Sequence, residues 1–493
     1  MNRFEYSRRY RRRRRNRRAA KIAAVIGCIA LIGICGTGAV FFGKKLLANP
    51  GAPSGGSVVV TQDQSNLADT GSSGTANTSD SAGTCNSTGA TGTTTPDSNQ
   101  PSPAASLLAQ AADLATGYDY DGAIALLQSN ADLASDPAVT AAIADYEAIR
   151  ESLVKVKVSE VTHVFFHSLV MDPAKAFDGD ADMDGYNQVM TTADEFHKIL
   201  QSMYDKGYVL VRMHDLAYET TDENGKPVMK PGTIMLPEGK IPFVMSQDDV
   251  CYYPYMDGDG FASRIVIGED GRPTCEMKQP DGTVVTGSYD LVPLLEDFIQ
   301  EHPDFSYRGA RAVLAFTGYE GILGYRTAAS YADSPTYASD REQAAKVAQC
   351  LKDHGWELAS HSWGHLNMGT IEMDRFRTDT DKWEQEVDSL IGPTDIILYP
   401  FGADISDWHP YTTENERFNY LYNAGFRYFC NVDSSRCWVQ IGDDYLRQGR
   451  RNLDGYRMWK DITAEDPSNR RLDDLFRAED VFDAARPTPV PEM

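Results

Sequence analysis

The sequence predicts an α/β protein whose main domain is a (β/α) barrel, distorted and seven-stranded, in a chain of 493 residues. Two observations indicate this fold. Short apolar runs alternate with amphipathic stretches between residues 157 and 462, which is typical of βα units and a parallel sheet. About seven such units occur in one run, which favours a closed barrel, although an open sheet is compatible with the same spacing.

The individual elements follow from hydrophobic periodicity and from the Gly and Pro residues that end each run. Apolar runs predict the strands, at 161–170, 208–216, 240–249, 309–318, 356–362, 394–402 and 426–433. Amphipathic spacing predicts the helices, at 193–207, 289–303, 339–355, 373–392 and 414–425. Two Asp-Gly turns between β-branched runs predict a hairpin insertion at 257–288.

The N-terminus has a strong charge asymmetry. The first 45 residues hold 13 Lys and Arg against a single acid, Glu5, and the basic tail 1–21 leads directly into 22–43, which is uncharged and mostly apolar. A helix over 22–43 is long enough to cross a bilayer. We therefore expect a transmembrane signal-anchor and a single-pass protein of the cell membrane, with the N-terminus cytoplasmic and the rest extracellular. A cleaved signal peptide is the alternative.

The regions flanking the barrel differ in composition. Residues 44–103 are rich in Ser, Thr and Gly, and we expect a disordered stalk because such a stretch buries little apolar surface. Ala and Leu recur at helical spacing in 104–156, which predicts a small helical spacer resembling a tetratricopeptide pair. Residues 463–493 are interpreted as a C-terminal tail.

The charge of the chain limits the classes of partner, and its cysteines limit the possible disulfides. The chain after residue 45 holds 34 basic and 70 acidic residues, a net charge of −36, so nucleic acid is not expected as a partner. The sequence does not allow a protein partner to be predicted, and it predicts contact with the membrane through 22–43. Among the possible disulfides, Cys251–Cys275 and Cys430–Cys437 join the cysteines nearest in sequence. Free thiols are the alternative.

Three strand ends carry residues suited to metal-assisted chemistry. Asp248 and Asp249 end one strand, His361 and His365 follow another, and residues 399–402 end a third. In a parallel barrel, functional residues lie where strands end and loops begin. Adjacent carboxylates diverge, so one can bind a metal while the other faces the substrate, and histidines four apart on a helical turn share a face. Each pair alone is as typical of a turn, a cap or packing. Together they supply three protein ligands and leave positions open for water and substrate.

The motifs in this order resemble those of the polysaccharide deacetylases, carbohydrate esterase family 4, which share the NodB-homology domain. That family's motifs are T-F-D-D, H-[ST]-x-x-H and R-x-P-[YF]-G. Here they read Ser-Gln-Asp-Asp at 246–249, His-Ser-Trp-Gly-His at 361–365 and Leu-Tyr-Pro-Phe-Gly at 398–402. The resemblance implies that Asp249, His361 and His365 bind a divalent metal, with Zn²⁺ expected and Co²⁺, Ni²⁺ or Mn²⁺ as alternatives.

The resemblance also implies roles for the remaining motif residues. Asp248 would be the general base. The third motif would contact the substrate and its oxyanion, the latter through the backbone N–H of Phe401; its residues are Tyr399, Pro400, Phe401 and Gly402.

Two departures from the family's pattern leave roles open. The third-motif arginine is Leu398 here, and its substitute is one of Arg447, Arg450 and Arg451. The family's late histidine, its general acid, has no counterpart after His409. The catalytic candidates for that acid are His409 and His167, either of which is equally compatible with a structural role. Gln247, in place of Phe, is a further sign of a divergent branch.

The sequence therefore predicts a membrane-anchored extracellular deacetylase that acts on an acetylated polysaccharide of the cell envelope, such as peptidoglycan or a related amino-sugar glycan. It leaves open whether N- or O-acetyl groups are removed. The first alternative is a catalytically impaired glycan-binding pseudoenzyme of the same fold, favoured by the missing late histidine. The second is a scaffold for envelope assembly built on the helical spacer.

Overall fold

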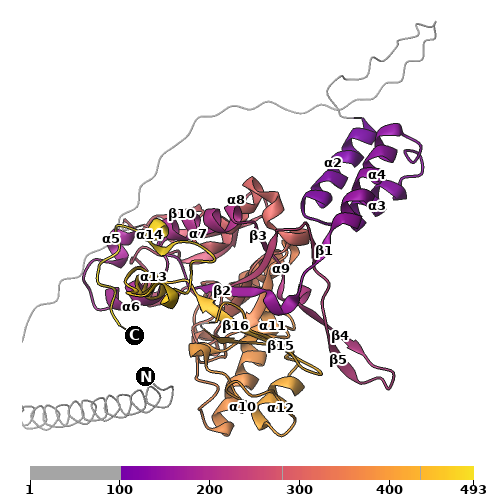
Figure 1. The fold of residues 1–493 in the computed structure, drawn as a ribbon. Helices are drawn as coiled ribbons and strands as arrows, with labels where there is room; N and C mark the ends of the chain where they lie inside the picture. Colours follow the sequence, from indigo (N-terminus) through magenta and orange to yellow (C-terminus); the bar gives the residue numbers. More distant parts are fainter. Residues whose placement is uncertain (1–101, 280, 434, 493) are drawn as a thin grey trace, which may run out of the picture. The chain divides into compact units, whose positions relative to one another are not determined.

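The computed structural model describes residues 102–279, 281–433 and 435–492, all within one compact unit of the chain, 94–493. At its centre is a closed ring of seven parallel strands, because β7 pairs with both β2 and β11 (Figure 1). In spatial order the strands are β11 (Val313–Phe316), β12 (Glu357–Ser360), β13 (Ile396–Leu398), β14 (Tyr428–Val432), β16 (Leu446–Asn452), β2 (Thr162–Phe166) and β7 (Ile241–Gln247). The predicted barrel is confirmed for the described residues.

The seventh strand differs from the prediction. The apolar run at 208–216 gives only β3 (Tyr208–Leu210), which pairs with the start of β7 outside the closed ring. The ring is completed by β16, for which the sequence analysis predicts no strand. Its sequence is Leu-Arg-Gln-Gly-Arg-Arg-Asn, yet six of its seven residues are buried. The hydrophobic pattern therefore missed a strand whose buried side chains are mostly polar.

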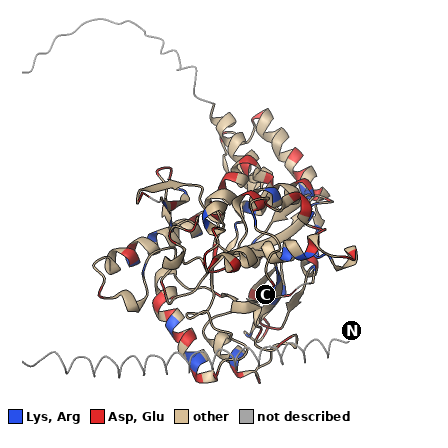
Figure 2. Ribbon diagram, turned by 90° about the vertical axis from the view of Figure 1, so that its left-hand side faces the viewer, with Lys and Arg blue, Asp and Glu red and all other residues tan. Residues whose placement is uncertain are grey.

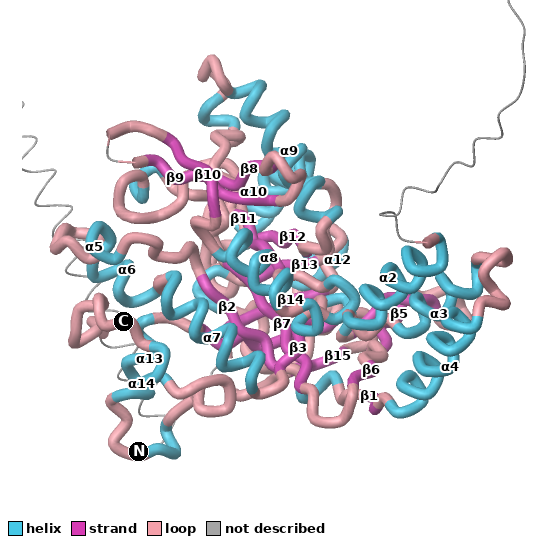
Figure 3. Tube along the Cα trace, turned by 90° about the horizontal axis from the view of Figure 1, so that it is seen from above, coloured by secondary structure: helices cyan, strands magenta, loops and turns pink. Residues whose placement is uncertain are grey.

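Helices cover the outside of the barrel (Figure 3). The outer helices are α7 (Ala193–Asp205), α8 (Leu291–Glu301), α9 (Tyr337–Asp353), α10 (Met373–Trp383), α11 (Ser389–Ile391) and α12 (Glu416–Asn423). Their apolar faces and the outward side chains of the strands form the main core, which includes Phe196, Phe243 and Leu314. A second cluster, including Val244, Ala359 and Leu398, fills the barrel interior. Alternate residues of each strand therefore face the two cores.

Several smaller elements extend the barrel. The insertion predicted as one hairpin is a three-stranded antiparallel sheet. The added strands are β1 (Val154–Lys155), which pairs with β6 (Met235–Leu236), β4 (Ala217–Thr221), which pairs with β5 (Pro227–Pro231), β8 (Arg264–Ile267), β9 (Pro273–Lys278), β10 (Val284–Gly287) and β15 (Val439–Ile441). Short helices α5 (Pro173–Ala176) and α6 (Met183–Val189) follow β2.

The segments on either side of the barrel both contact it. The predicted helical spacer forms α2 (Pro103–Thr116), α3 (Tyr120–Ser129) and α4 (Pro137–Ser152), and Tyr118 donates a hydrogen bond to the carbonyl of Asp304 (2.8 Å). The predicted C-terminal tail continues past α13 (Gly455–Ile462) and includes α14 (Ala478–Val481). Within this tail Arg486 forms an ion pair with Glu195 at 2.6 Å, and both side chains are fully buried. The tail is therefore part of the folded domain as far as residue 492.

Charged residues are spread over the folded part of the chain. Asp and Glu occur on most of the outer helices, with Lys and Arg between them (Figure 2). The stretch 46–103 contains only four acidic residues and no basic ones. The excess of negative charge predicted for the chain beyond its basic head is therefore carried mainly by the folded domain.

The expected transmembrane segment, 22–43, and the expected stalk, 44–103, lie outside the described residues except for positions 102 and 103. Among the helices that the structure does describe, none combines the length and apolar character needed to span a membrane. The five described cysteines are free thiols, including Cys251 and Cys275. The alternatives were disulfides and free thiols, and the structure shows free thiols at these five positions.

Candidate metal and catalytic site

Asp249, His361 and His365 meet at the carboxyl end of the barrel strands. One potential ligand atom from each side chain lies within 4.8 Å of the other two. Asp249 follows β7 and both histidines follow β12, two strands that only β11 separates in the ring. Their ends therefore bring together residues more than 100 positions apart in the chain. His361 is buried, whereas the side chains of Asp249 and His365 are partly exposed. The site therefore opens to solvent on one side.

Hydrogen bonds orient two of these three side chains. His361 Nδ1 lies 2.7 Å from the carbonyl oxygen of Leu398, so Nδ1 carries the proton and Nε2 keeps its lone pair. Tyr253 donates to one carboxylate oxygen of Asp249 (2.8 Å). Supporting hydrogen bonds of this kind are typical of metal-binding histidines and carboxylates. One carboxylate and two imidazoles also match the donor set that divalent zinc prefers. The residues present therefore fit a divalent metal ion.

Asp248 lies beside this group but is held differently. Its carboxylate accepts a hydrogen bond from Arg450 (2.6 Å) and lies 3.8 Å from Nε2 of His361. Burial alone would raise the pKa of Asp248, but the guanidinium of Arg450, together with His361 and His167, outweighs burial and holds that pKa well below its usual range. Asp248 is thus a buried carboxylate that stays ionised next to the three potential ligands.

Strand alternation decides which arginine contacts Asp248. Along β16, the side chain of Arg450 points into the barrel, while Arg447 and Arg451 point outward to Asp404 and Asp474. The three alternatives left open by the sequence are therefore reduced to Arg450. The assignment depended on which face of β16 is the inner one, and successive side chains of a strand point to opposite faces.

A polar layer inside the barrel supports Arg450 from below, and the sequence motifs do not reveal it. His163 contacts Gln448 at 3.1 Å and Ser246 at 2.9 Å, and Ser246 also accepts a hydrogen bond from Arg450 (3.2 Å). All four residues are buried, and burial lowers the pKa of His163 well below its usual value. Inward positions of three neighbouring strands thus form a chain that ends at Asp248. Ser246, two positions before Asp248 in the sequence, was the available signal.

The predicted substrate motif of β13 surrounds the same site unevenly. Tyr399 and Pro400 are buried, and Tyr399 packs into the outer core. Phe401 is 68% exposed, and its ring packs edge-on against His365 at 4.6 Å between centroids. Gly402 has φ +60°, and a Cβ there would lie 2.3 Å from Cβ of Val432. The glycine is therefore required by the turn, while Phe401 is the motif residue that borders the site.

Backbone strain is concentrated at this end of the barrel. Among described non-glycine residues with positive φ are one from the acidic pair, two from the histidine motif and one from the β13 motif. These residues are Asp249 (58°), Ser362 (56°), His365 (49°) and Phe401 (59°). Such conformations cost free energy and persist where surrounding structure enforces them, often at functional sites.

The two candidates for the general acid lie in different places. His167 follows β2, its Nδ1 lies 3.1 Å from the carbonyl of Val189, and its charge lowers the pKa of Asp248, although Arg450 and His361 lower it more. His409 is exposed, and its ring stacks on that of Trp408, which is 74% exposed. No contact links His409 to the metal-binding group within the described residues. The structure therefore places His167, and not His409, near Asp248.

The departure at Gln247 also has a structural partner. Gln247 is buried at the end of β7 and donates to Asp290 (2.9 Å). Asp290 also accepts from Tyr252 (2.6 Å) and from the backbone of Leu169 (2.8 Å). Burial raises the pKa of Asp290. The glutamine therefore belongs to a buried polar cluster behind the strand end, in a position where an apolar side chain would leave Asp290 with one donor fewer.

Comparison with known proteins agrees with the motifs. Residues 328–423 match the family model described as polysaccharide deacetylase, a stretch that contains His361, His365 and the β13 motif. The resemblance predicted from the motifs is confirmed for this stretch. Among solved structures, the chain is similar to the Streptococcus pyogenes deacetylase PplD in complex with acetate, at 14% identity and a TM-score of 0.32, over 61% of this chain and 93% of that one. No curated protein sequence matches the chain.

Proposed function

We propose that this protein is a metal-dependent deacetylase that removes acetyl groups from a polysaccharide of the cell envelope. The observation that carries the proposal is the combination of two features at one strand end. Asp249, His361 and His365 form a three-ligand group, and Asp248 beside them is kept ionised by Arg450. Hydrolytic metal sites need both features, a metal with open positions and a base that can take a proton.

The metal would be held by Asp249, His361 and His365. Zn²⁺ suits this mixed oxygen and nitrogen donor set, and Co²⁺, Ni²⁺ and Mn²⁺ are the alternatives. When bound, such an ion supplies Lewis acidity toward the acetyl carbonyl and toward water. The hydrogen bond from His361 to Leu398 and that from Tyr253 to Asp249 hold two of the ligand side chains in place.

Asp248 acts as the general base. Its carboxylate accepts the proton of the attacking water, and Arg450 keeps it aligned and unprotonated until then. Because Arg450 is itself fixed by Ser246, the base is positioned by a buried chain of hydrogen bonds that does not depend on a mobile loop. The backbone N–H of Phe401, at the edge of the site, stabilises the negative charge that develops on the acetyl oxygen.

His167 acts as the general acid that protonates the leaving group. Its Nδ1 is occupied by the carbonyl of Val189, so Nε2 is the nitrogen left to exchange a proton. This assignment gives the missing late histidine a replacement from the first barrel strand. An amine leaving group needs this proton more than an alcohol does, since nitrogen leaves poorly when unprotonated.

The protein is proposed to act outside the cell, anchored by residues 22–43. The support comes from the sequence alone: an uncharged apolar segment long enough to cross a bilayer follows a tail rich in arginine. An acetylated envelope glycan is the substrate class that such a position makes accessible. Protease added to intact cells should then release the folded domain by cutting within 44–103, whereas a protected domain would reverse the orientation.

The deciding experiment measures acetate released from acetylated envelope glycans by the full-length protein in detergent. Activity should disappear on treatment with a chelator and return with added Zn²⁺. An inactive protein that retains one bound metal ion and binds the glycan would instead support the glycan-binding pseudoenzyme.

A further inference from the structure

A cavity of about 340 Å³ adjoins the metal-binding loop. One wall is formed by Trp363 and Gly364, which lie between His361 and His365 in the sequence. Helix α10 and Tyr319 also contribute to its lining. Tyr319 stacks on Tyr253, the residue that donates to Asp249. The cavity is therefore continuous with the side chains that support the site and is not a separate feature of the surface.

Helical spacing determines which residues of α10 face this cavity. Arg375, Asp379 and Lys382 line it, at positions i, i+4 and i+7, which share one face of a helix. The other acidic residues of the helix have partners elsewhere. Asp374 pairs with Arg377 at 3.3 Å, and the carboxylate of Asp381 accepts a hydrogen bond from Tyr420.

The cavity wall carries two cations and one carboxylate, an excess of positive charge. Asp379 is buried, and its two oxygens accept the backbone N–H groups of Trp363 (2.9 Å) and Gly364 (2.8 Å). Arg375 and Lys382 are exposed, and neither has a carboxylate within 4.0 Å among the described residues. The ammonium of Lys382 lies over the ring of Trp363, 4.1 Å from its centroid. Two cations without a salt bridge in the described part of the chain, and one buried carboxylate, thus face one cavity on a chain with a net charge of −24.

We propose that this cavity binds an anionic group of the glycan, a carboxylate or a phosphate, on a residue adjacent to the one that is deacetylated. A guanidinium can form two parallel hydrogen bonds to such a group, and a lysine adds a point charge. The wall of Trp363 connects the cavity to both histidine ligands through a single loop. The substrate would therefore be an anionic acetylated polysaccharide, an inference that rests on the proposed function and specifies its substrate class.

The test uses the double variant Arg375→Gln and Lys382→Gln in the full-length protein. The matched control is Arg377→Gln, which removes one positive charge from the same helix at a position paired with Asp374 and Glu416. Three acetylated oligosaccharides of equal length are compared: neutral, carboxylate-bearing and phosphate-bearing. Circular dichroism checks that each variant is folded.

The double variant should lower the ratio of kcat/KM for anionic over neutral substrate by about tenfold, as expected for the loss of two partly exposed charge pairs. The control should keep the wild-type ratio. The wild-type ratio should also fall with rising salt, because exposed charges are screened. The anionic substrate with the larger effect identifies the group. An unchanged ratio in the double variant, or an equal change in the control, would overturn the proposal.

Binding separates this proposal from the proposed function. Calorimetry with the deacetylated forms of the same oligosaccharides requires no catalysis. Selective loss of anionic binding in the double variant would support the cavity even if the wild-type protein releases no acetate. If instead acetate is released and anionic and neutral sugars bind equally, the deacetylase proposal stands and the anionic site is wrong.

Discussion

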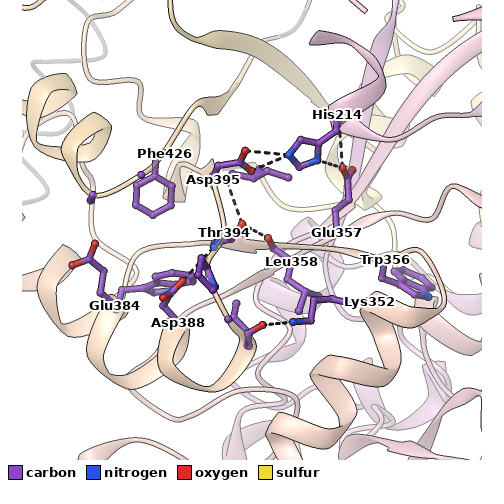
Figure 4. Close-up of a pocket in the computed structure, with 17 residues that line it drawn as sticks. His214, Lys352, Trp356, Glu357, Leu358, Glu384, Asp388, Thr394, Asp395 and Phe426 are labelled. Atoms are coloured by element: carbon purple, nitrogen blue, oxygen red, sulfur yellow. Dashed lines mark hydrogen bonds and ion pairs between the residues drawn. The ribbon is translucent and has the colours of Figure 1, made fainter. Parts of the chain in front are cut away.

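Two clusters of histidine and carboxylate side chains lie at opposite ends of the same barrel. Strand β12 connects them, since Glu357 is its first residue and His361 follows its last. The cluster at the strand start borders a cavity whose lining is drawn in Figure 4. Its volume is about 520 Å³, compared with about 340 Å³ for the cavity beside the metal-binding loop. By residue type and cavity size alone, the strand start would be the better candidate for a functional site.

The hydrogen bonds of the histidines distinguish the two ends. At the strand start, His214 uses both ring nitrogens, Nδ1 with Glu357 and Nε2 with Asp395 at 3.0 Å. Burial lowers the pKa of His214, but its hydrogen bonds with Asp395 and Glu357 outweigh burial and raise that pKa to about 10. At the strand end, His361 forms a hydrogen bond with the described part of the protein through Nδ1 only. A histidine with one ring nitrogen free of hydrogen bonds can bind a metal through that nitrogen. A histidine whose two nitrogens both contact carboxylates instead forms a structural ion pair.

The largest expected difference between the two ends is in catalysis. Asp248→Asn should keep the metal but lower kcat by at least about 10²–10⁴-fold, the usual contribution of general-base assistance. An amide cannot accept the proton of water. His214→Gln should leave kcat unchanged, because His214 lies at the other end of β12. Acetate release by both variants at saturating metal checks this. Equal losses would show that the two ends are not functionally distinct.

The variant Asp249→Asn tests the role of the other residue of the acidic pair. It should weaken metal binding first, so its activity should recover partly with excess Zn²⁺, whereas that of Asp248→Asn should not. If both variants respond to added metal in the same way, the division of roles between base and ligand is wrong.

Metal binding is the next largest effect. His365→Ala should reduce affinity for Zn²⁺ by more than the roughly 10–100-fold that loss of a supporting hydrogen bond costs, since it removes a ligand itself. His214→Ala should retain one ion per chain, because both of its nitrogens are already bonded. Metal content after dialysis measures both. Full occupancy in His365→Ala would return the histidine pair to a packing role.

Local motifs predicted the strand end better than they predicted the fold around it. Asp248, Asp249, His361 and His365 were found because each pair lies within five residues of sequence. The strand β16 was missed because its inward positions, which include Gln448 and Arg450, are polar, and hydrophobic periodicity cannot register a buried polar strand.

Other features depend on register or on contacts between distant elements, which one sequence does not specify. The choice of Arg450 over its neighbours follows from which face of β16 points inward. The preference for His167 over His409 follows from the position of β2 next to β7. The ion pair of His214 with Asp395 joins residues 181 positions apart. Sequence reasoning named these arginines and the two candidate acids but could not choose among them.

The general acid should give a smaller and substrate-dependent effect. His167→Ala should slow release of N-acetyl groups by about 10²-fold, the lower end of acid–base contributions, and slow release from O-acetyl esters less. The matched control is His409→Ala, which changes an exposed histidine stacked on Trp408 and should alter neither rate. Both activities are measured for both variants. Equal losses on the two substrates would give His167 a structural role.

The smallest effect is on stability at the strand start, and it depends on pH. His214 is half-exposed, so its pairing with Glu357 and Asp395 should contribute about 1 kcal/mol to the free energy of unfolding. The pKa is raised in the folded protein to about 10, from 6.5, so the folded state binds the proton more tightly. The contribution is therefore fully present below pH 6.5 and is lost as the pH rises toward 10. Urea unfolding of wild type and His214→Gln at pH 6, 8 and 10 should show a stability difference that shrinks with pH, while other titrating groups cancel between the two proteins. A stability difference that is constant over this range would mean that His214 is neutral in the folded protein. The two ends of the barrel would then no longer differ as a charged ion-pair cluster at the strand start and a metal-binding group at the strand end.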